Sequence, residues 1–215
     1  GMILATALWT LASYVGGDGA IPNSEPGPMA TMLMGLSSFY ISIFVVSAVR
    51  DNRLTALQGS ASNSILAALA IFSGLTLCIL TMSILYALQY LGIELRPGNQ
   101  ALLEDAGKNT PVVVGIFVVL IAPVFEELFF RKQIFARFQA AGFTVIGYIS
   151  SSLLFALMHE PLPTQGLLKW SLMLLMYGLL GAAFAWIYQK TGKLWPAILA
   201  HASNNLCAMA ILLLV

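Results

Sequence analysis

The sequence predicts an all-α fold: a polytopic membrane helix bundle with six transmembrane helices and a short seventh at the N-terminus. Composition supports this, since 59% of the 215 residues are hydrophobic, 9% are charged and the mean hydropathy is +0.88. A soluble domain carries about 25% charged residues, so a soluble globular fold is excluded. The charges lie mostly between uncharged runs long enough to cross ~30 Å of hydrocarbon. The formal net charge of +1 gives no footprint for nucleic acid, and the lipid bilayer is the expected partner.

The N-terminal half contains one short apolar run and two long ones. Residues 2–15 would cover only about 21 Å as a helix, so they are interpreted as a short or truncated seventh helix. A loop rich in Gly and Pro follows at 16–28. Uncharged runs then predict helices at 29–49 and 64–91, and the charged segment 94–109 predicts a loop or a surface helix.

The C-terminal half supplies four further spans, predicted at 110–130, 138–158, 170–189 and 194–215. We expect the first of them to continue past Arg131 toward Gln139, because only a longer helix lets its polar residues meet those of the next span. Gly178, Gly181 and Ala182 predict a close helix–helix contact. The chain is therefore a single membrane domain, 1–215, whose core at 110–210 carries the motifs described next.

Basic residues follow alternate spans, which predicts that their loops share one side of the membrane. Lys and Arg favour cytoplasmic loops, so that side is expected to be cytoplasmic. The clusters are Arg50 with Arg53, then Arg131, Lys132 and Arg137, then Lys190 with Lys193.

Two adjacent carboxylates, Glu126 and Glu127, interrupt one of the most apolar stretches of the chain. A charge at mid-bilayer costs ~2.5–3.5 kcal/mol, so ionisable residues there are functional candidates. Arg131 lies four residues after Glu127 and shares its helix face, where it can hold that carboxylate ionised. Glu126 points about 100° away and can face a cavity. The alternative is that all three residues mark a helix end at the lipid headgroups.

Two further motifs place imidazole and amide groups in apolar runs. In Phe155-Ala-Leu-Met-His159, Phe155 lies one turn before His159 on the same helix face. In His201-Ala-Ser-Asn-Asn205, His201 and Asn205 share a face and can aim at one point. The alternatives are an interfacial histidine and hydrogen bonds that serve only helix packing. These alternatives weaken when one small bundle holds all the groups.

Together, the three segments resemble the motifs of the CAAX protease and bacteriocin-processing family of intramembrane proteases. That family carries E-E-x-x-x-R, F-x-x-x-H and H-x-x-x-N on successive core helices, and the same order occurs here. The resemblance implies endopeptidase activity on a peptide or protein substrate that reaches the membrane. It also implies a cavity open to the cytoplasmic side, and we expect an integral protein of a prokaryotic plasma membrane. Eukaryotic members cleave prenylated CAAX proteins, whereas a prenyl substrate is not implied here.

Peptide hydrolysis needs a base for the attacking water and donors for the oxyanion. We expect Glu126 to be the general base, with His159 holding the same water. Glu127 would orient the site, and His201 and Asn205 would donate to the oxyanion. The expected site thus comprises Glu126, Glu127, His159, His201 and Asn205 as catalytic residues, with Arg131 and Phe155 as substrate-binding or orienting residues.

No cofactor is favoured, and zinc is the alternative. Zinc would use His159, His201 and Glu126 as ligands with water in the fourth position. We favour the metal-free hypothesis because Asn205 is a poor zinc ligand and a good hydrogen-bond donor. Two other functions compete: a non-catalytic immunity or scaffold protein, and a proton-coupled transporter with the acids and imidazoles as a relay. A scaffold predicts that the Glu and His groups lie apart, and transport predicts a polar path to both faces.

Overall fold

The computed structural model describes residues 64–96 and 111–214, and this part of the chain is helical with no strand. The predicted helices at 2–15 and 29–49, and most of the loop predicted at 94–109, lie outside the described residues. The elements are α3 (Ser64–Tyr90), α5 (Pro111–Ile116), η2 (Phe117–Ile121), α6 (Ala122–Glu127), η3 (Leu128–Phe135), α7 (Ala136–Ala140), α8 (Thr144–His159), α9 (Leu167–Thr191) and α10 (Leu194–Leu214).

Three of the described helices are long and apolar enough to cross a membrane: 64–90, 112–140 and 167–191. These three helices make the chain an integral membrane protein. The apolar helix α8 is shorter, with 16 residues, and α10 has 21 residues and closely matches the span predicted at 194–215. The total of six spans and a short seventh stays a prediction, because two of those segments lie outside the described residues.

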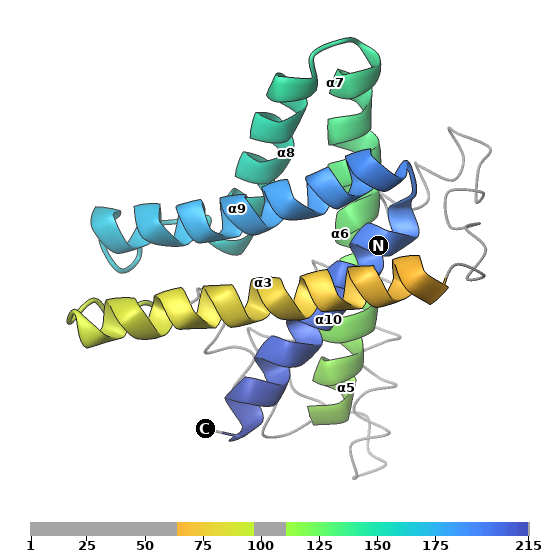
Figure 1. Cartoon of the computed structure of the whole chain (residues 1–215). Coiled ribbons are helices and arrows are strands. Elements are labelled where there is room, and N and C mark those ends of the chain that lie inside the picture. Colours follow the sequence, from red (N-terminus) through yellow and green to blue (C-terminus); the bar gives the residue numbers. More distant parts are fainter. Residues whose placement is uncertain (1–63, 97–110, 215) are drawn as a thin grey trace, which may run out of the picture.

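The segments from α5 to α7 form one continuous helix, which appears as the green rod in Figure 1. The predicted continuation past Arg131 toward Gln139 is confirmed. Glu126 lies midway along this helix, 14 residues from either end of the 29-residue span. The carboxylates therefore lie in the middle of a long helix rather than at a helix end.

Two stretches of this helix, η2 and η3, are π-helical and flank the glutamate pair. Pro123 accounts for the first, because its ring clashes with the carbonyl four residues earlier and forces the turn to widen. In the π register, the N–H of residue 123 would bond the carbonyl of Val118, and a proline has no N–H. Val118 therefore needs a donor from elsewhere in the fold.

Two helix pairs pack most extensively, α3 with α10 and α8 with α9. Gly74 lies against α10 so closely that an added Cβ would be 2.9 Å from the Ala200 carbonyl carbon. At Gly181, a Cβ would be 3.1 Å from the Cα of Ser152, which confirms the predicted close contact at that position. The prediction is wrong at Gly178, where nothing lies within 4 Å of a Cβ.

Candidate active site

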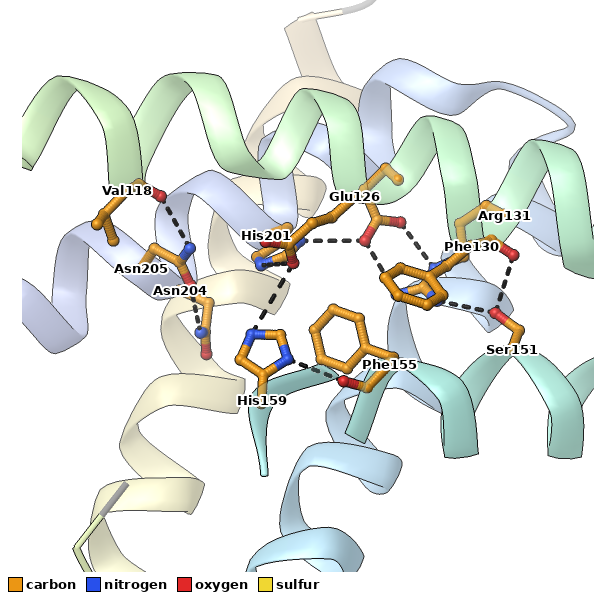
Figure 2. A network of polar contacts seen from close by, with 11 residues as sticks. Val118, Glu126, Phe130, Arg131, Ser151, Phe155, His159, His201, Asn204 and Asn205 are labelled. Atoms are coloured by element: carbon orange, nitrogen blue, oxygen red, sulfur yellow. Dashed lines mark hydrogen bonds and ion pairs between the residues drawn. The ribbon is translucent and has the colours of Figure 1, made fainter. Parts of the chain in front are cut away.

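The two histidines of the chain come together on one carboxylate. The Nε2 atoms of His159 and His201 lie 3.9 and 3.8 Å from the same Oε2 of Glu126 (Figure 2). Groups that share one bridging water can be up to about 4.5 Å apart, since each lies about 2.8 Å from it. Three separate helices therefore bring an acid and two imidazoles within the distance that one bridging water can span. The predicted convergence is observed.

Glu127 and Arg131 form a doubly hydrogen-bonded ion pair whose side chains are both fully buried. Arg131 Nε donates to Oε2 at 2.8 Å and its Nη2 donates to Oε1 at 2.9 Å. Nη1 donates to the hydroxyl of Ser151 at 2.9 Å, and this hydroxyl donates to the carbonyl of Phe130 at 2.9 Å. The predicted pairing is confirmed. The alternative that these residues mark a helix end is wrong, because the helix continues to Ala140.

The other ring nitrogen of each histidine is also bonded, which determines where its proton lies. His159 Nδ1 is 2.9 Å from the carbonyl of Phe155, an atom that can only accept. His201 Nδ1 is 3.1 Å from Oε1 of Glu127, whose charge Arg131 balances. Both Nδ1 atoms therefore carry the proton, and both Nε2 atoms face Glu126. A carboxylate behind an imidazole in this way also orients the ring.

Phe155 is the central ring of the site and is almost fully buried. Its centroid lies 4.5 Å from the ring of His159 and 5.6 Å from that of His201. The guanidinium carbon of Arg131 lies 5.2 Å from the same centroid, within the range of a cation–π contact. Phe155 therefore contacts both imidazoles and the guanidinium of Arg131, and its role as an orienting residue stays a prediction. Arg131 pairs with Glu127.

Asn205 donates from Nδ2 to the carbonyl of Val118 at 2.9 Å (Figure 2). Asn205 thus replaces the N–H donor that Pro123, five residues after Val118, cannot supply. Asn204 in turn donates to Oδ1 of Asn205 at 3.2 Å. Asn205 thus ties α10 to the first π-helical stretch, a role that the motif alone did not reveal. An amide nitrogen carries two N–H groups, so one remains for another acceptor.

The residues of the zinc hypothesis lie somewhat farther apart in this arrangement than the ligands of a bound zinc would. Within the described ranges, no group of three or more His, Cys, Asp or Glu side chains is placed to hold a metal ion. The nitrogen and oxygen ligands of a tetrahedral zinc lie about 3.3 Å apart, at metal–ligand distances of about 2.0–2.1 Å. The corresponding separations from Glu126 are 3.8 and 3.9 Å.

Sequence reasoning missed Ser151, Asn204 and two aromatic residues of α9, Tyr177 and Phe184. Ser151 could have been found, since it lies four residues before Phe155 and eight before His159 on one helix face. Asn204 was visible as a neighbour of Asn205 but carried no spacing signal. The α9 aromatics could not be distinguished from other apolar residues, because their role depends on which helices pack together.

The fold and the site define a class: a helical integral membrane protein with a buried acid–imidazole centre. Comparison with known proteins then shows which family the chain resembles. Residues 108–207 match the family model described as type II CAAX prenyl endopeptidase Rce1-like, and all three motifs lie within that range. The predicted resemblance to the CAAX protease and bacteriocin-processing family is therefore confirmed.

One similar protein is "Putative membrane peptidase YdiL" of Bacillus subtilis (strain 168). It is 28% identical over 208 residues, which cover 94% of this chain and 80% of the relative. No solved structure matches the chain significantly. The similarity to this relative thus extends well beyond the 108–207 core.

Proposed function

We propose that this protein is an intramembrane endopeptidase of the CAAX-protease type, which hydrolyses a peptide bond with a water activated by Glu126 and His159. The observation that carries the proposal is that both histidines face one buried carboxylate oxygen at the distance of a shared water. The family match and the peptidase relative support the same reaction class. We further propose a prokaryotic plasma membrane as the location, with the site reached from the cytoplasmic side.

In the proposed reaction, Glu126 takes a proton from the water while the water oxygen attacks the carbonyl carbon of the substrate. Because His159 Nδ1 is protonated toward Phe155, its Nε2 accepts the other hydrogen bond of that water and holds it. The proton on Glu126 then passes to the amide nitrogen as the carbon–nitrogen bond breaks. The products are a free carboxyl group and a free amine.

The negative charge on the carbonyl oxygen needs donors at the same point. His201 can donate from Nε2 only as an imidazolium, because its Nδ1 proton is already directed at Glu127. Glu127 stabilises that cation, and Arg131 keeps the carboxylate ionised and in place. Asn205 donates with its remaining N–H. Loss of one such donor typically lowers the rate by about 10²–10³-fold.

The test compares cells that carry the active protein with cells that carry Glu126→Gln, by proteomics of substrate fragments. Fragments present only with the active protein identify the substrate, which is then cleaved by purified protein in lipid vesicles. Glu126→Gln and His159→Ala should abolish cleavage, while the matched control Glu94→Gln, an exposed carboxylate on a loop, should not. Cleavage at the normal rate by both site variants would end the proposal.

A second measurement tests metal dependence. We expect purified protein to contain no stoichiometric zinc by elemental analysis and to keep its cleavage rate in the presence of a chelator. Stoichiometric zinc, together with chelator inhibition that added zinc reverses, would instead make His159, His201 and Glu126 metal ligands.

A further inference from the structure

Helix α9 carries none of the three motifs, yet it contacts both imidazoles of the site. The ring of Tyr177 stacks on His159 with centroids 4.5 Å apart and an interplanar angle of 24°. The ring of Phe184 stacks on His201 at 4.6 Å and 14°. Positions 177 and 184 are seven residues apart, about two helical turns, so both rings project from one face of α9.

Phe155 also contacts both imidazoles. It contacts His159 at 4.5 Å with a tilt of 38° and meets His201 edge-on at 5.6 Å and 66°. Each imidazole is therefore bounded by two aromatic rings and bonded through Nδ1 to an acceptor. The bond at Nδ1 limits rotation within the ring plane, and the stacked ring sets the plane itself. Together they direct both Nε2 atoms at Glu126.

We infer that Tyr177 and Phe184 are positioning residues, which hold the two imidazoles in the planes that aim Nε2 at Glu126. The kinetic part of this inference rests on the proposed function. Phe184 also lies 5.8 Å from the guanidinium carbon of Arg131, so its ring supports the ion pair as well. Tyr177 is the sharper test, because its ring contacts His159 and not the ion pair that stabilises the core.

The ring of Tyr177, and not its hydroxyl, is the part that holds the imidazole of His159 in its plane. That hydroxyl lies within electrostatic reach of Glu160 and Glu126, so a role in the reaction is the natural rival explanation. The two explanations separate with two substitutions. Tyr177→Leu removes the ring and the hydroxyl, whereas Tyr177→Phe removes the hydroxyl alone and keeps the stack.

The chain offers a direct readout because it contains two histidines and no more. Protein labelled with ¹⁵N- and ¹³C-histidine, purified through a tag without histidine, gives one set of NMR signals for each imidazole. His159→Gln assigns them. We expect Tyr177→Leu to shift the ring signals of His159 and Phe184→Leu to shift those of His201. The control Tyr86→Leu, at an exposed position on α3, should shift neither.

The kinetic arm uses the identified substrate in vesicles. A displacement of about 1 Å in a catalytic group can cost about 10²-fold, so we expect Tyr177→Leu to lower kcat by that order with KM nearly unchanged. Tyr177→Phe should restore kcat to within a few-fold. A Tyr177→Phe rate as low as that of Tyr177→Leu would overturn the inference, as would unchanged His159 signals in Tyr177→Leu.

The outcomes also separate this inference from the proposed function. If Glu126→Gln cleaves normally, the proposed function fails, while the NMR arm still tests whether the rings orient the imidazoles. If Glu126→Gln is inactive and Tyr177→Leu has normal kcat, the positioning role alone is overturned.

Discussion

Gly74 is the point at which a single methyl group should displace one histidine of the site. Its Cα lies against the backbone of α10 at Ala200, the residue directly before His201. A Cβ at position 74 would lie 2.9 Å from both the Ala200 carbonyl carbon and the Ser203 Cβ, and closer still to the Ala200 carbonyl oxygen. The neighbour is helix backbone, so it cannot rotate away, and Gly74→Ala must separate α3 from α10.

The size of the displacement follows from these contacts. Ordinary van der Waals contact is 3.4–4 Å, so the 2.9 Å separations must grow by at least about 0.5–1.1 Å, and the closer contact with the Ala200 carbonyl oxygen must grow by more. Moving His201 by that amount would stretch its 3.1 Å bond to Glu127 to about 4 Å, beyond hydrogen-bonding distance. We expect a rate loss of about 10²-fold. Overpacking should cost about 1–3 kcal/mol of stability, against about 1 kcal/mol gained from the better helix propensity of alanine.

The assay combines cleavage of the identified substrate with the NMR signals of the two histidines. Gly178→Ala is the matched control, because nothing lies within 4 Å of a Cβ there and the change should stabilise α9 by about 0.5–1 kcal/mol. Gly74→Ala should shift His201 and leave His159 in place. Normal turnover with an unchanged His201 signal would show that α3 yields instead of α10 and would refute the reasoning.

Three further predictions concern residues that support the site: Arg131, Ser151 and Asn205. Arg131→Met should destabilise the protein by about 3–5 kcal/mol in detergent unfolding experiments, because it leaves the buried Glu127 carboxylate without its cation. Ser151→Ala should cost about 1–3 kcal/mol in the same measurement, whereas Ser171→Ala, whose exposed hydroxyl bonds its own helix, should change stability by less than about 0.5 kcal/mol. Asn205→Leu should lower both stability and kcat, since it removes the Val118 bond and a proposed oxyanion donor; a loss of kcat at full stability would contradict the bond to Val118.

Hydrophobic length and charge placement predict the described helices to within a few residues in most cases. The span predicted at 64–91 is observed at 64–90, and the one predicted at 170–189 is observed at 167–191. The largest difference is at 138–158, where the helix begins at Thr144. Residues 138–140 belong to the preceding helix, because an uncharged run does not show where one helix ends and the next begins. Gly142, with φ of 85°, lies in the turn between them.

The sequence predicted which polar residues come together, but only part of how they are arranged. Spacing on one helix face was sufficient for the pairing of Glu127 with Arg131. Local patterns could not show that Tyr177 stacks on His159 or that Gly74 meets Ala200, because both depend on which helices are neighbours. The wide turn before the glutamates was within reach, since Pro123 inside an apolar helix must disturb the hydrogen-bond register.

The bonds made around the two π-helical stretches explain how adjacent glutamates serve different partners. Inside a membrane, a backbone carbonyl that loses its helical donor, as Val118 does because of Pro123, must find one on another helix. Val118, in η2, receives its donor from Asn205 on α10, and Phe130, in η3, accepts from Ser151 on α8. Those two helices also carry the two histidines. The two π-helical stretches therefore connect α10 and α8 to the glutamate helix, one on each side of the acid pair. These backbone bonds, together with the contacts among the site residues, set the register of both helices relative to the carboxylates.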